Sequence, residues 1–171
     1  QVPVELVDEL NHLYSHSGDA AEKQGLANWP KQIAHADWHP GNMLFRDDRV
    51  MAVVDYDAAR WLPRIMDVAN GALQFSIIDG DADVNRWPDF VDESRYRRFM
   101  RGYDRVQLLS EAELHALPWL MIEALIAEAA IPIAATGSFG RHSGADFLQM
   151  VRRKVRWIAD HADNLTEIAE R

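Results

Sequence analysis

The residues best suited to chemistry lie in one short stretch of the chain. Asp37 and Asn42 stand five residues apart in a loop, and Asp55 follows thirteen residues after Asn42, directly after an apolar run over 50–54. Two apolar runs with a polar middle separate Asn42 from Asp55, which predicts a β-hairpin over 43–54. Since a hairpin returns its end close to its start, we expect the three side chains to converge.

This set of side chains predicts phosphoryl transfer. A carboxylate and an amide oxygen that meet at one point suit a hard cation such as Mg²⁺, which prefers oxygen ligands. A second carboxylate nearby can accept the proton of an attacking hydroxyl. A metal on the phosphates and a positioned nucleophile are what phosphoryl transfer requires.

A zinc site is a second interpretation of the same stretch. His35, Asp37 and His39 alternate as H-x-D-x-H, and zinc hydrolases use such clusters together with further histidines. The other five histidines form no matching second motif. Zinc hydrolysis and a purely structural loop therefore remain as alternatives to phosphoryl transfer.

The stretch resembles the catalytic loop and the metal-binding aspartate of the aminoglycoside phosphotransferase and choline kinase family, which has the protein-kinase-like fold. That family writes the loop as H-G-D-x-H-P-x-N and the later element as I-D-[FWY]. This sequence reads H-A-D-W-H-P-G-N over 35–42 and V-D-Y over 54–56. A third family feature, an aspartate that opens the next helix, is matched by D-V-A over 67–69.

The resemblance implies a role for each residue of the motif. Asp37 would be the catalytic base or the group that positions the hydroxyl. His39 would lie in or beside the active site, and His35 would brace the loop. Asn42 and Asp55 would be the Mg²⁺ ligands and would thereby bind ATP.

The resemblance also has implications for two residues outside the set above. Asp67 would hold the catalytic loop by hydrogen bonds, which is a structural role. Ala36 stands where the family usually has glycine. If that position requires a positive φ, alanine is strained there.

The periodicity predicts a mainly α-helical chain with one small β-hairpin, an α+β class. A short strand is expected at 33–34, and loops are expected over 18–30, 56–63 and 79–89. Ser110 and Glu113 match a capping box at the start of a helix that Pro118 should bend or restart. Helices are expected over 4–16, 65–78, 92–105, 110–130 and 143–169.

Length and composition predict one globular domain over 1–171, since 48% of the 171 residues are apolar and 26% are charged. Within it lie the catalytic loop 35–42, the metal-binding segment 53–57 and a helical subdomain over 65–171. The resemblance implies that this is the C-terminal helical lobe of the kinase-like fold. The 34 residues before the loop contain no glycine-rich loop and no Val-Ala-x-Lys strand. We therefore expect the N-terminal nucleotide lobe to be absent and the fragment to be inactive alone.

Charge and hydropathy exclude several classes of partner. A formal net charge of −9 argues against binding to nucleic acid, and the lack of cysteine excludes disulfides, cysteine-bound zinc and thiol nucleophiles. The most apolar stretch, 114–135, contains Glu123 and Glu128, which favours a buried helix over a membrane span. No targeting segment is recognisable, so we expect a cytoplasmic protein.

Taken together, these features predict the catalytic lobe of a Mg²⁺-dependent small-molecule kinase, which transfers the ATP γ-phosphate to a hydroxyl of a metabolite or antibiotic. The helices after Asp67 faintly resemble the homoserine-kinase-like branch. Expected partners are the acceptor, the missing N-terminal lobe of the same protein, and a second copy bound through exposed apolar surface. The alternative is a non-catalytic helical lobe used for binding or assembly, as in a pseudokinase.

Overall fold

The computed structural model describes residues 2–78 and 80–170, and most of these are helical. The expected class, mainly α with small β elements, is confirmed. The helices of the described residues are α1 (Val4–Lys23), α2 (Ile65–Ser76), α3 (Glu93–Asp104), α4 (Glu111–Thr136), α5 (Gly144–Asp160) and α6 (Ala162–Ala169). Their strands are β1 (Lys31–Ala34), β2 (Met43–Arg46), β3 (Arg49–Val53), β4 (Arg60–Pro63), β5 (Ser138–Phe139) and β6 (His142–Ser143).

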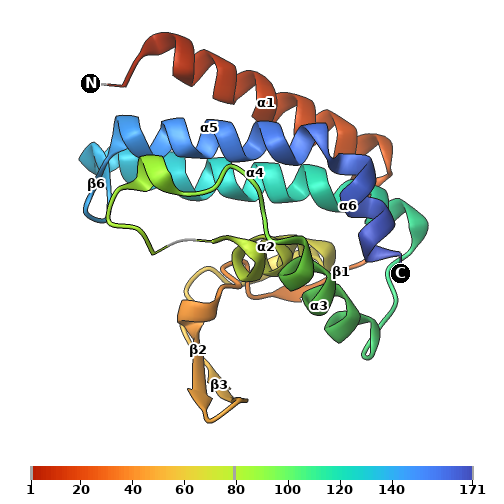
Figure 1. Cartoon of the computed structure of the whole chain (residues 1–171). Helices are drawn as coiled ribbons and strands as arrows, with labels where there is room; N and C mark the ends of the chain where they lie inside the picture. Colours follow the sequence, from red (N-terminus) through yellow and green to blue (C-terminus); the bar gives the residue numbers. More distant parts are fainter. Residues whose placement is uncertain (1, 79, 171) are drawn as a thin grey trace.

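Helix α4 is the centre of the core. It packs against α1, α2, α5 and α6, and Figure 1 shows α1, α4 and α5 running side by side with α2 and α3 below them. It is the one described helix long and apolar enough to cross a membrane, but 56% of its apolar window is buried among the other helices. A helix that is apolar all round is expected in such a core position.

The start and the course of α4 differ in how well the sequence predicts them. Ser110 and Glu113 form the predicted capping box. However, α4 continues without a break through Pro118 to Thr136, whereas a bend near Pro118 and an end near 130 were expected. Proline at 118 leaves the carbonyl of Leu114 without its helical partner, and this carbonyl instead accepts a hydrogen bond from the Thr166 hydroxyl of α6, at 3.4 Å.

Two other helix boundaries are corrected by packing. Helix α1 ends at Lys23 instead of at 16, because Ser17 and Ala21 continue its buried face. The expected single helix over 143–169 is divided into α5 and α6 at His161. The His161 ring hydrogen-bonds the carbonyl of Trp157 at 2.8 Å, and the two rings are stacked 4.2 Å apart.

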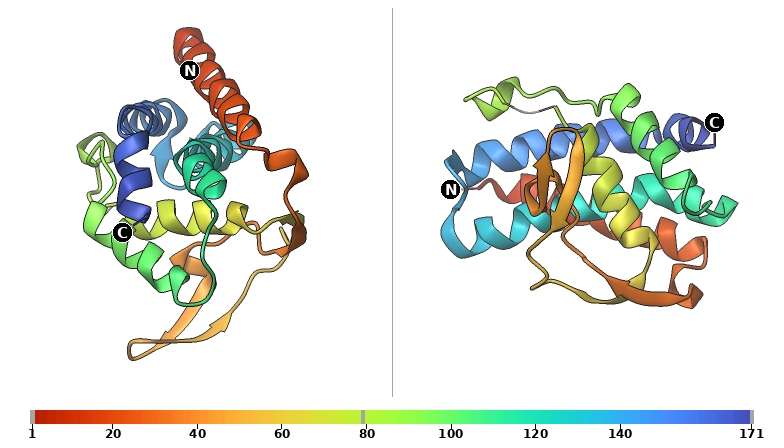
Figure 2. Two further views of the ribbon diagram at one scale, coloured as in Figure 1. Left: turned by 90° about the vertical axis from the view of Figure 1, so that its right-hand side faces the viewer. Right: turned by 90° about the horizontal axis from the view of Figure 1, so that it is seen from below.

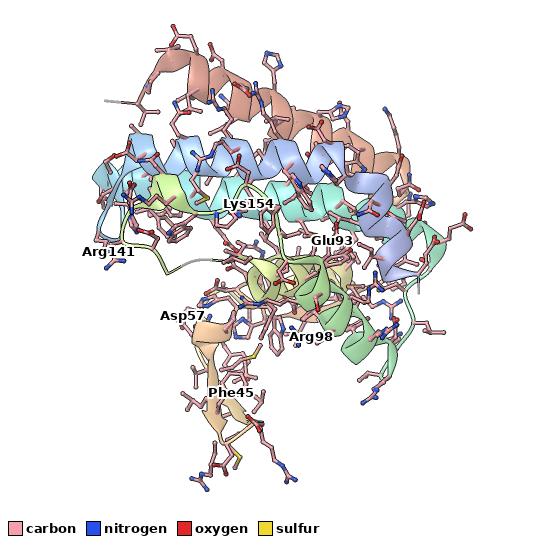
Figure 3. All side chains as sticks on the ribbon, viewed as in Figure 1. Phe45, Asp57, Glu93, Arg98, Arg141 and Lys154 are labelled. Carbon is pink, nitrogen blue, oxygen red and sulfur yellow. The ribbon has the colours of Figure 1, made fainter. Side chains whose placement is uncertain are left out.

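The β elements are three separate two-stranded antiparallel pairs: β1 with β4, β2 with β3, and β5 with β6. The β2–β3 pair is the predicted hairpin, and it projects away from the helices, with Phe45 near its far end (Figures 1 and 3). Strand β4 lies in the segment expected to be a loop. It pairs with β1 in the register Lys31↔Pro63 to Ala34↔Arg60. This pairing is long-range, so the local sequence pattern does not predict the strand.

Helix α2 lies very close to both the 35–42 loop and α3, and a glycine makes this approach feasible. A Cβ atom on Gly71 would lie 2.5 Å from Phe99 of α3 and 2.7 Å from Trp38 of the loop. Figure 2 shows α2 crossing the long helices on the side from which the hairpin projects. This close packing determines where the loop sits relative to the core.

Candidate active site

Helix α2 holds the start of the 35–42 loop through one carboxylate. Asp67 accepts the backbone N–H of His35 at 2.7 Å and that of Ala36 at 2.8 Å. Ala36 has φ of 62°, so the position is left-handed and an alanine there is strained. The loop keeps this conformation because the Asp67 carboxylate captures two consecutive amides.

The end of the loop is tied back to Asp37. The Asn42 side-chain amide donates to the Asp37 carbonyl at 2.9 Å and to the Asp37 carboxylate at 2.8 Å. Asn42 is only 6% exposed. The Asn42 nitrogen is used by Asp37, whereas its amide oxygen accepts no hydrogen bond within the described residues and is available to a further group.

The hairpin brings Asp55 beside this loop. The N–H of Val54 donates to the Asn42 carbonyl at 2.9 Å, and the His35 ring contacts the Val54 carbonyl at 2.9 Å. Asp55 follows directly with φ of 64°, and its exposed carboxylate makes no hydrogen bond or ion pair within the described residues. Asn42 therefore lies next to Asp37 on one side and next to the Asp55 segment on the other.

His39 lies against the Asp37 carboxylate. Its Nδ1 accepts the N–H of Gly41 at 3.0 Å, so the ring proton is on Nε2, which lies 3.5 Å from Asp37 Oδ2. A Cβ atom on Gly41 would lie 2.7 Å from the His39 ring, so glycine is required for this contact. The ring thus presents an N–H toward the carboxylate.

His35 is buried behind the loop. Its ring lies 5.0 Å from that of Tyr56 and 5.6 Å from that of Trp38. These contacts suit a bracing role. Within residues 2–78 and 80–170, no three His, Asp or Glu side chains are grouped so that they could hold a metal ion, so this arrangement gives the zinc alternative no support.

A cavity of about 340 Å³ opens beside Asp37. The 58–62 segment and helices α1, α2 and α4 form its walls. The polar side chains that line it are Tyr14, Asp37, Arg60, Asn70, Glu123 and Glu128. Asn42 and Asp55 are not among the residues that line this cavity.

Helices α2 and α4 are joined inside this cavity by Glu128. Its carboxylate accepts a hydrogen bond from Asn70 at 2.6 Å and one from Gln74 at 2.5 Å. Burial raises the pKa of Glu128, and the negative charge of Asp37 raises it further. Burial also raises the pKa of Glu123, where the second contribution is the charge of Glu22.

Sequence reasoning did not identify Asn70, Gln74 or Glu128 as site residues. A usable signal was present, because Asp67, Asn70 and Gln74 recur at helical spacing on one face of α2. Glu123 and Glu128 are likewise the charged residues in the apolar middle of α4. These two observations would have suggested that polar faces of the two helices meet.

Known proteins with similar sequences cover the same part of the chain. The family model described as "Phosphotransferase enzyme family" matches residues 17–115, which include the loop, the hairpin and Asp67. The chain is similar to a homoserine kinase of Granulibacter bethesdensis, with 32% identity over 122 residues, which cover 66% of this chain and 34% of the relative.

Two further relatives are similar to the same extent. A homoserine kinase of Brucella ovis is 34% identical over 102 residues, covering 60% of this chain and 29% of the relative. A homoserine kinase of Nitrobacter hamburgensis is 31% identical over 116 residues, covering 66% of this chain and 29% of the relative. The chain spans about a third of the length of the curated relatives it matches.

Proposed function

Because this chain belongs to the phosphotransferase enzyme family, we propose that it is the catalytic C-terminal lobe, a single domain, of a small-molecule kinase that transfers the γ-phosphate of ATP to an acceptor hydroxyl. The observation that carries the proposal is the hydrogen-bonded pair of Asp37 and Asn42, with the Asp55 segment on one side and the cavity on the other. Phosphoryl transfer requires a metal site on one side of the catalytic carboxylate and a binding site for the acceptor on the other.

Asn42 and Asp55 are the proposed Mg²⁺ ligands. Their oxygens fit the group, because neither the Asn42 amide oxygen nor the Asp55 carboxylate has a partner within the described residues. Oxygen donors of this kind are those that Mg²⁺ prefers. When bound, Mg²⁺ would supply positive charge to the phosphates of ATP.

Asp37 is the proposed proton acceptor. It lines the cavity, so an acceptor hydroxyl bound there would donate a hydrogen bond to its carboxylate. As the hydroxyl oxygen attacks the γ-phosphorus, the proton passes to Asp37 and ADP leaves. The Asn42 amide and the His39 ring hold the carboxylate in place for this step.

Homoserine, or a hydroxyl compound of similar size, is the proposed acceptor. The support is the printed name of the relatives together with the cavity volume of about 340 Å³, which is at the small end of the range for ligand pockets. A cavity of this size suits a single small metabolite better than an oligosaccharide.

The proposed enzyme needs a further lobe to grip ATP. The relatives are about twice as long as this chain. The projecting hairpin exposes a set of large apolar side chains: Leu44, Phe45, Val50 and Met51. We propose that the N-terminal lobe of the same protein covers this surface, and that a second copy of the chain covers it when that lobe is missing.

The test is ADP formation by the full-length protein that contains this chain, with ATP, Mg²⁺ and L-homoserine. We expect turnover that requires all three, and a loss of at least two orders of magnitude in kcat for Asp55→Ala. Asp163→Asn, at an exposed position in the first turn of α6, is the matched control and should leave kcat unchanged. A folded protein that forms no ADP with any hydroxyl acceptor would favour the non-catalytic binding lobe instead.

A further inference from the structure

The wall of the cavity contains a buried acceptor atom that has no donor. Asn70 is 7% exposed and lines the cavity. Its amide nitrogen donates to Glu128, but its amide oxygen is buried and has no hydrogen-bond partner within the described residues. An unpaired buried carbonyl oxygen is energetically costly, and one in a cavity wall can be satisfied by a bound ligand.

A ligand group that donates a hydrogen bond to the Asn70 amide oxygen must also be compatible with the Glu128 carboxylate beside it. The two side chains are hydrogen-bonded to each other and face the same space. Burial and the charge of Asp37 disfavour the ionised form of Glu128, and a cation beside it would reverse that effect. An ammonium group has a positive charge for the carboxylate and three N–H donors, one of which can go to the Asn70 oxygen.

Glu123 is a poorer candidate although it lines the same cavity. Its oxygen lies 3.0 Å from the position that a Cβ on Gly18 of α1 would take, and the charge that acts on it is that of Glu22. Glu128 instead responds to the charges of Asp37 and His39. Glu128 is thus the cavity carboxylate on the side of the catalytic loop.

We propose that Asn70 and Glu128 form the subsite that binds the ammonium group of the acceptor. The acceptor class is then an amino alcohol, short enough for its hydroxyl to meet Asp37 while its amine lies on Glu128. This inference rests on the proposed phosphotransfer function and assigns specificity to two residues, of which Glu128 lies outside the segment 17–115 that the family model matches.

Helix α2 links this subsite to the catalytic loop. Asp67, Asn70 and Gln74 are on one face of α2, where Asp67 holds the loop and the other two hold Glu128. The distance from the amine subsite to Asp37 is therefore determined by a rigid helix. Such a distance selects among amino alcohols by the spacing between amine and hydroxyl.

The test compares binding of two probes to the full-length protein without ATP. L-Homoserine carries the ammonium group and 4-hydroxybutyrate lacks it, so the ratio of their dissociation constants, measured by isothermal titration or NMR titration, reports the subsite. We expect homoserine to bind at least tenfold more tightly. In Glu128→Gln this advantage should fall by roughly 10- to 100-fold, the worth of a charge-assisted hydrogen bond.

Glu111→Gln is the matched control, because Glu111 is an exposed glutamate in the first turn of the same helix. It should keep the wild-type preference. Asn70→Ala is the second variant if Glu128→Gln does not fold, and it should also reduce the preference. Equal binding of the two probes by the wild type, or an unchanged preference in the folded variants, would overturn the proposal. So would loss of the preference in Glu123→Gln alone.

Failure of this inference and failure of the proposed function give different results. If homoserine loses its binding advantage in Glu128→Gln but no phosphate is transferred, the subsite stands and the reaction is wrong. If phosphate is transferred and Glu128→Gln still prefers homoserine, the reaction stands and the subsite is wrong.

Discussion

Asp37 and Asp55 have different roles in the proposed reaction, and substitutions can distinguish these roles. In the full-length enzyme, Asp55→Ala should lower kcat more than Asp37→Asn. The metal held by Asp55 stabilises the charge of the transferring phosphoryl group, whereas a loose transition state depends less on proton removal by a base. Steady-state kcat values at saturating ATP and acceptor measure the difference. The reverse order would contradict the roles assigned to the two aspartates.

The left-handed backbone of Ala36 predicts a stabilising substitution. A left-handed residue other than glycine costs about 1–2 kcal/mol, and the extra freedom of glycine in the unfolded chain offsets about 0.5–1 kcal/mol of the gain. We therefore expect Ala36→Gly to raise the free energy of unfolding by about 0.5–1 kcal/mol, as measured in urea.

Ala52→Gly is the comparison for this measurement, since Ala52 lies in β3 with an ordinary strand backbone. It should destabilise by about 0.5–1 kcal/mol because glycine weakens a strand. Equal effects of the two glycine substitutions would show that the conformation of Ala36 stores no strain.

The sequence predicts the local part of the site far better than the rest. Asn42 and the Asp55 segment come together because a hairpin joins them, and a hairpin can be recognised from 43–54 alone. The contact between Asn70 and Glu128 spans 58 residues and depends on how α2 crosses α4. Glu128 therefore looked only like an interruption of an apolar helix.

At the scale of elements, one buried lysine fixes the segment before α3 onto α5. Lys154 is 0% exposed, and its ammonium donates to the carbonyls of Pro88 and Phe90 at 2.5 and 3.0 Å. Figure 3 shows it on α5 above this segment. Burial lowers the pKa of Lys154 from 10.5 to about 8, against the opposing charge of Asp89.

This lowered pKa predicts a pH dependence of stability. Between about pH 8 and 10.5 the unfolded chain binds the proton of Lys154 more than the folded chain does, so the contribution of Lys154 to stability rises with pH in this window. Urea unfolding from pH 7 to 10 should show a rising difference between wild type and Lys154→Met. The exposed Lys31→Met should show none, and a flat difference for Lys154→Met would refute the assignment.

The β elements show where element prediction reaches its limit. The hairpin of β2 and β3 was expected because its strands are adjacent in the chain. Strand β4 was missed because it is extended only through its pairing with β1, about thirty residues away. For the same reason the end of α1 depends on contacts of Ser17 and Ala21 with the core, which a boundary judged from local pattern does not include.

For the whole molecule, we predict that residues 1–171 alone fold but do not act as a kinase. The helical core is continuous, so a cooperative unfolding transition is expected. Without a covering lobe, the phosphates of ATP would contact the site from one side only and stay solvated. Calorimetry should detect weak Mg²⁺ binding and no tight binding of Mg·ATP.

The comparison protein for this measurement is the full-length enzyme in the same buffer. It should bind Mg·ATP at least tenfold more tightly than the short chain. Micromolar affinity and steady turnover by residues 1–171 would mean that the nucleotide site is built within this chain.

Helix α2 also has a consequence for thermal motion. Because the catalytic loop and Glu128 are both attached to one face of α2, a small displacement of that helix carries both groups in the same direction. We therefore expect their separation to fluctuate less than the position of either group relative to α1 or α5. An acceptor bound between the two groups would then keep its alignment while the surrounding helices move.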